Sequence, residues 1–288
     1  MRATARRRSP RCAGSTRRSS PTSRREGVRA TKRRALGQHF LRDAGVARAI
    51  VDLVAPTAAD LVVEIGPGEG ALTGELVRRA GRVVALEIDR GLAGRLSARF
   101  PSIEVVEADA RVWEYGAIAR PRDGRALVVG NLPYSVGKPI LAALIAARTA
   151  IDEMVLMLQR EVAERVAAPP GGKTYGSLSV LSQLYCDARI ALRVPPGAFR
   201  PPPAVESAVL HLRVLRGPRV ALSDERRFHA VVRAAFAQRR KTLANALAAG
   251  LGVSLAVVRA SATTAGVDPG RRAETLSILE FAELARRL

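Results

Sequence analysis

LVVEIGPGEGALT, residues 61–73, is the stretch that decides the fold of this chain. Apart from Glu64, its first five residues are apolar and mostly β-branched. A glycine-rich turn follows them directly, and a helical pattern begins where the turn ends. Glycines in such a turn let the backbone approach a bound ligand closely. A buried strand, a tight turn and a helix in this order are typical of α/β folds that bind nucleotides or nucleosides.

Apolar runs of the same kind recur along the chain and alternate with helical patterns. The strand-like runs are residues 83–89, 103–109, 126–131, 154–159 and 208–214. Nearly continuous apolar character is expected of strands buried on both faces. Helical patterns at 71–81 and 139–148 fill two of the gaps. We therefore predict a doubly wound, Rossmann-like parallel α/β sheet that binds its ligands at the carboxyl ends of the strands.

The strand pattern ends near residue 217, and the remainder reads as helical, for example at 228–247. Ser277 with Glu280 three residues later predicts a capping box for the last helix. The first 31 residues are rich in Arg, Ser and Thr and have few apolar side chains to offset the entropy of ordering. We predict three parts, namely a disordered basic tail (1–31), an α/β domain (32–217) and a small helical domain (218–288).

The composition limits the class of protein and its partners. The chain has 288 residues, 48% of them hydrophobic, and a net charge of +21. Its first 34 residues hold 13 of the 47 lysines and arginines and one of the 26 acids, so the remainder still carries +9. Such an excess favours a polyanion, most commonly nucleic acid. The tail itself is compatible with an RNA-binding arm, an organelle transit peptide or translation begun upstream of the true start.

Several classes are disfavoured by what the sequence lacks. No run of about 18 apolar residues and no secretory signal is present, so we expect a cytoplasmic protein without a membrane span. Cys12 and Cys186 are the only cysteines, beside three histidines. These are too few for a disulfide framework or a cysteine zinc site, so we expect no protein-held metal.

The glycine turn favours a cofactor without phosphates. Gly66, Gly68 and Gly70 are spaced G-x-G-x-G, whereas the dinucleotide fingerprint is G-x-G-x-x-G. Two carboxylates, Glu64 and Glu69, would repel a pyrophosphate at this turn. S-adenosylmethionine fits better, because it joins a sulfonium cation to an amino acid and a ribose.

Two more acids follow the next two predicted strands. Glu87 ends the second strand, where it can accept hydrogen bonds from both ribose hydroxyls, as acids do in nucleoside-binding α/β folds. Asp109 ends the third strand, where it could accept from the adenine amino group. A lone acid after a strand is often only a helix cap. Acids at the ends of three successive strands point to a nucleoside site.

The fourth strand ends in Asn131-Leu132-Pro133-Tyr134, a stiff turn beside the cofactor. An exocyclic amine of a nucleobase is a poor nucleophile, because its lone pair is delocalised into the ring. The Asn131 side-chain oxygen and the Leu132 carbonyl can each accept one of its N–H groups, Pro133 fixes their geometry, and Tyr134 can stack on the base. An enzyme that methylates C5 would need a nucleophilic cysteine here, and the turn has none.

Seven ordered motifs resemble the bacterial small-subunit (16S) ribosomal RNA adenine N6,N6-dimethyltransferases, whose loss is associated with kasugamycin resistance. They are KRRALGQHFL (32–41), EIGPGEG (64–70), NLPY (131–134), MLQREVAERV (157–166), PPGGKTYGSLSV (169–180), FRPPPAVESAV (199–209) and FAQRRKTLANAL (236–247). The resemblance runs from about Lys32 to the C-terminus. It implies a monomer in which the α/β domain binds S-adenosylmethionine and the helical domain binds RNA.

The resemblance also implies roles for single residues. The cofactor would contact His39, Leu41, Gly66, Glu87, Asp109 and Asn131. Other members carry Asn where His39 stands, which leaves the role of that side chain open. Phe199 would close the face of the target base opposite Tyr134. Lys173 and Tyr175 would lie in a loop that faces RNA or only solvent, and Arg239, Arg240 and Lys241 would contact phosphate or form a solvated helix face.

The expected activity is the transfer of two methyl groups to each of two adjacent adenines near the 3′ end of 16S rRNA. A rival is the related macrolide-resistance type of methyltransferase, which modifies a large-subunit adenine; the 169–180 loop and the 236–247 segment favour the small subunit. A noncatalytic RNA-binding assembly factor is a second rival, disfavoured by the intact NLPY. A dehydrogenase is a third, disfavoured by the glycine spacing.

Overall fold

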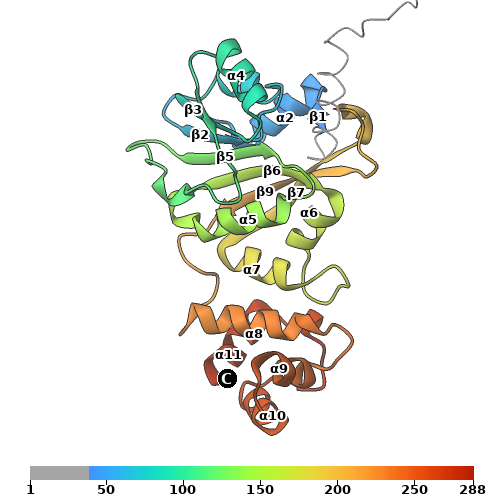
Figure 1. Cartoon of the computed structure of the whole chain (residues 1–288). Helices are drawn as coiled ribbons and strands as arrows, with labels where there is room; N and C mark the ends of the chain where they lie inside the picture. Colours follow the sequence, from blue (N-terminus) through green and yellow to red (C-terminus); the bar gives the residue numbers. More distant parts are fainter. Residues whose placement is uncertain (1–38) are drawn as a thin grey trace, which may run out of the picture. The chain divides into compact units, whose positions relative to one another are not determined.

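The computed structural model describes residues 39–288. The predicted tail at 1–31 lies outside the described residues, as does most of the 32–41 motif. Within the described part a seven-stranded sheet runs in the order β4-β3-β2-β5-β6-β9-β7 (Figure 1). Its strands are β2 (Leu61–Ile65), β3 (Arg82–Glu87), β4 (Glu104–Glu107), β5 (Ala126–Asn131), β6 (Glu153–Gln159), β7 (Cys186–Val194) and β9 (Ser207–Val214).

The five strands from β4 to β6 are parallel, and β9 and β7 extend the sheet in antiparallel pairing. The predicted Rossmann-like sheet is therefore confirmed, with two antiparallel strands at one side. Sequence patterns missed β7 because charged residues interrupt its apolar ones, as expected at an edge exposed to water. A second, two-stranded ribbon pairs β1 (Phe40–Leu41) with β8 (Phe199–Arg200).

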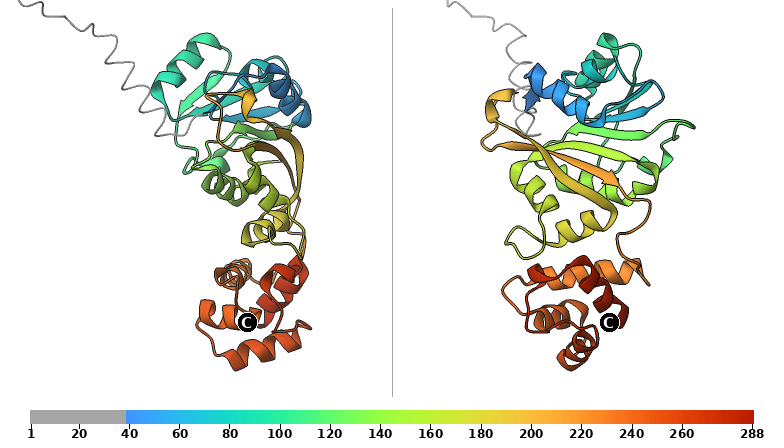
Figure 2. Two further views of the ribbon diagram at one scale, coloured as in Figure 1. Left: turned by 90° about the vertical axis from the view of Figure 1, so that its right-hand side faces the viewer. Right: turned by 180° about the vertical axis from the view of Figure 1, so that it is seen from behind.

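Helices cover both faces of the sheet, as the doubly wound prediction requires (Figures 1 and 2). Val62 and Val129 pack on one face with residues of α2, whereas Val63 and Val128 pack on the other with residues of α5, α6 and α7. The helices of this part are α2 (Ala44–Val54), α3 (Thr73–Leu76), α4 (Arg90–Arg99), α5 (Gly137–Ala146), α6 (Arg160–Ala167) and α7 (Ser177–Tyr185). Short 3₁₀ turns are η1 (Tyr115–Ala117), η2 (Arg148–Ala150) and η3 (Pro196–Ala198).

The helix predicted over 71–81 was too long, since α3 covers only Thr73–Leu76. Around it, i−3 bonds such as Glu75 N–H to the Leu72 carbonyl alternate with i−4 bonds. Gly74 lies inside this segment and lowers its intrinsic helix propensity. The glycine turn thus passes into one irregular helical turn rather than a long helix.

The C-terminal part is helical, as predicted. It contains α8 (Glu225–Ala237), α9 (Leu243–Leu251), α10 (Leu255–Thr264), η4 (Ala273–Thr275) and α11 (Ile278–Arg287). The pattern at 228–247 is split by a turn between α8 and α9. The capping box is confirmed, because Ser277 Oγ accepts from the Glu280 N–H at 3.2 Å and Glu280 Oε2 accepts from the Ser277 N–H at 2.7 Å. The last strand ends at residue 214, and the proposed domain boundary near 217 falls before α8.

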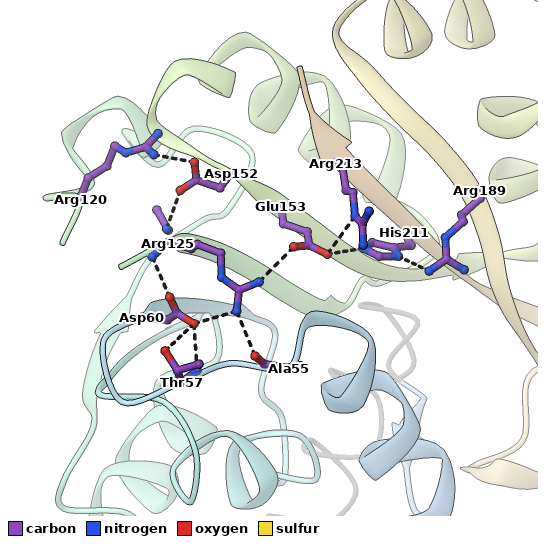
Figure 3. Close-up of polar contacts among 11 residues, drawn as sticks. Ala55, Thr57, Asp60, Arg120, Arg125, Asp152, Glu153, Arg189, His211 and Arg213 are labelled. Atoms are coloured by element: carbon purple, nitrogen blue, oxygen red, sulfur yellow. Dashed lines mark hydrogen bonds and ion pairs between the residues drawn. The ribbon is translucent and has the colours of Figure 1, made fainter. Parts of the chain in front are cut away.

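A polar network crosses the amino edge of the sheet, away from the predicted ligand edge (Figure 3). Arg125, just before β5, bonds Asp60 Oδ2 at 2.8 Å and Glu153 Oε2 at 3.3 Å. Glu153 also contacts His211 Nε2, and Arg189 lies 2.7 Å from His211 Nδ1. Asp60 and His211 are almost fully buried. The network therefore joins β2, β5, β6, β9 and β7. Each buried charge in it is compensated by its partner, and removing one partner would leave the other uncompensated.

None of the helices within 39–288 is long and apolar enough to cross a membrane.

Candidate active site

The glycine turn adopts the conformation that its sequence predicts. Gly66, Gly68 and Gly70 have φ angles of +64°, +57° and +83°, a region that side chains with a Cβ rarely enter. A Cβ added to Gly68 would lie 2.9 Å from the Phe40 ring, so the turn is also closely covered there. The three glycines thus place the turn at the carboxyl end of β2 in a conformation that other residues rarely adopt.

Glu87 links this turn to the end of β3. Its Oε2 accepts from the Gly68 N–H at 3.1 Å, and its Oε1 accepts from the Asp89 N–H at 2.9 Å. The carboxyl group is almost fully buried, and this burial raises its pKa although both backbone bonds oppose the shift. Glu87 therefore ties the glycine turn to the end of β3, and its contact with a cofactor stays a prediction.

Glu64, at the end of β2, is buried behind the same turn. Its Oε2 accepts from Thr73 Oγ1 at 2.6 Å, whereas its Oε1 is buried without a hydrogen-bond partner. Burial raises the pKa of Glu64 to about 7; the Thr73 hydrogen bonds oppose the rise, and the charge of Glu87 adds to it. From sequence we counted this residue among the three strand-end acids and expected it to repel phosphate, but we assigned it no contact with the cofactor.

Asp109, after β4, is joined to the same edge through its neighbour, because the Ala108 N–H donates to the Glu87 carbonyl at 3.2 Å. Its carboxylate is bound by Arg111, whose Nη2 lies 2.5 Å from Oδ2. Hydrogen bonds from Arg111 lower the pKa of Asp109. An open pocket lies beside it, lined by residues that include Val112 and Trp113. The pairing with Arg111 was missed from sequence, although the two residues stand only two positions apart.

Asn131, the last residue of β5, lies next to the glycine turn. A Cβ on Gly66 would be 3.5 Å from the Asn131 carbonyl, which shows how close the two segments are. Asn131 Nδ2 donates to the His39 carbonyl at 3.0 Å. This bond fixes the amide so that its oxygen remains the acceptor. The Leu132 N–H donates to the Met157 carbonyl at 3.0 Å, which anchors the start of the turn to β6.

Tyr134 completes the turn and contacts two other segments. Its hydroxyl lies 2.6 Å from the hydroxyl of buried Ser207, and burial raises its pKa. Its ring centroid lies 5.4 Å from that of His39 at a tilt of 34°. The Nδ1 of His39 lies 2.8 Å from the Pro201 carbonyl. Ser207 was not foreseen as a partner of Tyr134, and no signal in the sequence links them.

The β1–β8 ribbon brings two further predicted residues to this region. Leu41 pairs with Phe199, and both side chains are buried in the core cluster on the α2 face. The Phe199 side chain is only 5% exposed. A target base could therefore stack on its ring only by entering next to the β1–β8 ribbon. Its role against the target base stays a prediction.

The loop at 169–176 contacts the C-terminal helical part through Tyr175 and Lys173, which the sequence did not predict. The Tyr175 side chain is buried and packs edge-on against the Phe236 ring, with centroids 6.0 Å apart, so neither alternative left open for it, RNA or solvent, is correct. Lys173 is exposed, and its carbonyl accepts from Arg239 Nη2 at 2.5 Å. Arg239, Arg240 and Lys241 lie in the turn after α8 rather than on a helix face, and all three are exposed.

The residues brought together at this edge fit S-adenosylmethionine. Three acids lie at or near the ends of three neighbouring strands, and one of them has a buried oxygen without a hydrogen-bond partner. A cationic cofactor with ribose and amino groups supplies donors to such acceptors. Among residues 39–288, no cluster of three or more His, Cys, Asp or Glu could hold a metal ion.

Comparisons with known proteins agree with this geometry. The family described as Ribosomal RNA adenine dimethylase matches residues 29–288. Two curated relatives are each called Ribosomal RNA small subunit methyltransferase A. The one from Geobacter sulfurreducens is 45% identical over 91% of this chain and 96% of its own length. The one from Anaeromyxobacter sp. (strain K) is 46% identical over 89% and 93%.

Solved structures give the same picture. A dimethyladenosine transferase from Plasmodium falciparum has a TM-score of 0.71 at 25% identity, covering 85% of this chain and 96% of that one. The 23S rRNA methyltransferase ErmE has a TM-score of 0.66 at 27% identity, covering 86% and 99%. The family match covers all of the candidate site. This chain therefore belongs to the ribosomal RNA adenine dimethylase family and is an S-adenosylmethionine-dependent rRNA adenine dimethyltransferase.

Proposed function

We propose that this enzyme transfers two methyl groups to the N6 amino nitrogen of each of two adjacent adenines near the 3′ end of 16S rRNA, within the small ribosomal subunit or its precursor. The observation that carries the proposal is Asn131, held by His39 at the edge of the glycine turn. The relatives named for the small subunit are 43–46% identical to the chain, whereas ErmE, named for 23S rRNA, is 27% identical. This difference favours the small subunit over the large one.

The mechanism rests on how the target amine is held. When bound, S-adenosylmethionine supplies an electrophilic methyl group on a sulfonium. The Asn131 side-chain oxygen and the Leu132 carbonyl accept the two N–H groups of the adenine, which favours a pyramidal nitrogen whose lone pair is free to attack. The base reaches this turn only if it leaves the helical stack, and Tyr134 offers a ring for it to stack on.

The cofactor is held from the neighbouring strands. Glu87 accepts from the ribose hydroxyls, Asp109 accepts from the adenine amino group, and Gly66 lets the backbone lie against the ligand. Leu41 and His39, on and beside β1, cover the site from the ribbon. The helical part, with exposed Arg240 and Lys241, contacts rRNA phosphates. The proposal includes a monomer that acts in the cytoplasm.

The substrate is tested by incubating the protein and labelled S-adenosylmethionine with unmethylated 30S subunits, 50S subunits and naked rRNA. We expect label in the 30S particles. Label confined to 50S subunits would contradict the proposal and favour the macrolide-resistance type of activity. RNA binding without any transfer would instead favour a noncatalytic assembly factor.

Glu87→Ala is expected to weaken the binding of S-adenosylmethionine by about 1.5 to 3 kcal/mol, because hydrogen bonds to a charged acceptor are lost. The variant also frees the Gly68 N–H from its partner. Calorimetry on the folded variant measures the change. Glu107→Ala, at an exposed acid that ends the neighbouring strand β4, is the control and should bind normally. Unchanged affinity in Glu87→Ala would remove Glu87 from the site.

Tyr134→Ala and Tyr134→Phe separate stacking from hydroxyl chemistry. Loss of the ring should weaken the hold on the flipped adenine by about 1 to 3 kcal/mol. Tyr134→Phe keeps the ring but leaves the buried Ser207 hydroxyl without its partner, so we expect a stability loss of about 1 kcal/mol and near-normal transfer. Single-turnover transfer to 30S and thermal unfolding measure the two effects. Equal loss of transfer in both variants would mean that the hydroxyl takes part in the reaction.

A further inference from the structure

Glu64 is the buried acid at the cofactor edge to which the proposed function gives no task. Its register neighbours Ala85 and Val129 belong to the apolar cluster on the α2 face. One carboxyl oxygen is bound by Thr73 at 2.6 Å, and the other has no hydrogen-bond partner although it is buried. An ionised carboxylate with an unpaired oxygen in such surroundings is strongly disfavoured. It needs either a proton or a nearby cation.

The groups around Glu64 do not supply that cation. Thr73 on α3 is neutral, and Glu87 on β3 is a second acid whose charge acts on Glu64. The other acid of the turn, Glu69, is paired with Arg42 at 2.6 Å. The two oxygens of Glu87 each accept a backbone N–H, which sets it apart from Glu64. Among the described residues no ion pair compensates Glu64, so its carboxyl group takes either a proton or the positive charge of a bound ligand.

We propose that Glu64 carries a proton in the empty site and releases it to solvent when a cationic cofactor binds. This inference rests on the proposed function only in taking S-adenosylmethionine as the ligand. The cofactor has a net charge of +1, from its sulfonium, ammonium and carboxylate groups. The product, S-adenosylhomocysteine, is neutral overall because the sulfonium has become a thioether. Glu64 thus ionises with the methyl donor and regains its proton with the product, which helps the site to prefer the donor.

The consequence is a dependence of affinity on pH. Burial raises the pKa of Glu64 to about 7, so the acid is largely protonated below neutrality. Binding that releases one proton becomes about tenfold weaker for each pH unit below that value, and it levels off above it. The neutral product should show a shallower slope, so that discrimination between donor and product falls in acid.

The experiment is calorimetry of S-adenosylmethionine binding between about pH 5.5 and 8.5, in buffers of different ionisation enthalpy. We expect the wild-type protein to release protons on binding near pH 7 and Glu64→Gln to release far fewer. The ammonium of the cofactor, with an ordinary pKa of about 7.7 to 8.0, titrates equally in both proteins and cancels in the comparison. Glu75→Gln, on α3 beside Thr73, is the control and should behave as wild type.

Thr73→Val provides a second, independent test in which the Glu64 side chain is retained. It removes the hydrogen bond that favours the carboxylate, so the pH at which affinity levels off should move upward. Equal proton release in wild type and Glu64→Gln would assign the proton to another group, such as buried Glu87, and overturn the inference. An unmoved pH profile in Thr73→Val would overturn it as well, even if Glu64→Gln did not fold. Failure of the wild-type protein to bind S-adenosylmethionine at any pH would instead contradict the proposed function.

Discussion

Asn131→Ala should lower the single-turnover rate of methyl transfer to unmethylated 30S subunits by about 100-fold to 1000-fold. The substitution removes one of two acceptors aimed at the amine as positive charge develops on it. The amide is preorganised, because its Nδ2 donates to the His39 carbonyl at 3.0 Å. A preorganised hydrogen bond of this kind costs no reorganisation at the moment of reaction, and its loss is correspondingly large.

The affinity for S-adenosylmethionine should fall much less in the same variant, since Glu87 and Asp109 on other strands supply most of the proposed contacts. The measurement needs cofactor and 30S both at saturation, so that binding does not limit the rate. Asn245→Ala, on α9 and away from the turn, is the control. Normal turnover in Asn131→Ala would reduce NLPY to a structural turn.

Arg125→Met should lower the free energy of unfolding by about 3 kcal/mol at pH 7, because buried Asp60 and Glu153 lose their shared cation (Figure 3). Methionine keeps much of the packing made by the aliphatic part of the Arg125 side chain. The loss of stability therefore measures mainly the removal of the positive charge. Arg122→Met, at an exposed position of the same loop, is the control and should change stability little. Urea unfolding of both variants measures the difference.

The pH dependence of that difference has a definite sign. Burial raises the pKa of Asp60, but hydrogen bonds from Arg125 and Thr57 outweigh it and lower the pKa to about 2. A depressed folded-state pKa gives stability that is present above the unfolded value, near 4, and is lost as the pH falls toward 2. The gap between wild type and Arg125→Met should therefore narrow over that range. A constant gap would mean that Arg125 acts through packing alone.

Much of the fold could be predicted because buried parallel strands have a clear sequence pattern. Continuous apolar runs marked β2 to β6, and the positive φ angles of Gly66, Gly68 and Gly70 agree with the glycine-rich turn. The edge strand β7 was missed because its alternating charges match neither a buried strand nor a helix. Tyr175 was misjudged because its neighbours in the loop are small and polar, and only tertiary packing against Phe236 buries it.

The site was predictable in its residue types and not in their interactions. Acids at strand ends are visible in a sequence, but the partners of those acids depend on side-chain geometry. The pairing of Asp109 with Arg111 and the unpaired oxygen of Glu64 became apparent only in three dimensions. The bond between Tyr134 and Ser207 joins positions 73 residues apart and follows from the sheet topology.

The most direct test of the account is to locate and count the methyl groups added to unmethylated 30S subunits. After exhaustive reaction with S-adenosylmethionine, nuclease fragments of the 16S rRNA would be analysed by mass spectrometry. The account predicts two methyl groups on the N6 atom of each of two adjacent adenines near the 3′ end, and far fewer after reaction with Asn131→Ala over the same time. Methylation of a single isolated adenine, of another base atom, or of large-subunit rRNA in preference to 30S would contradict it.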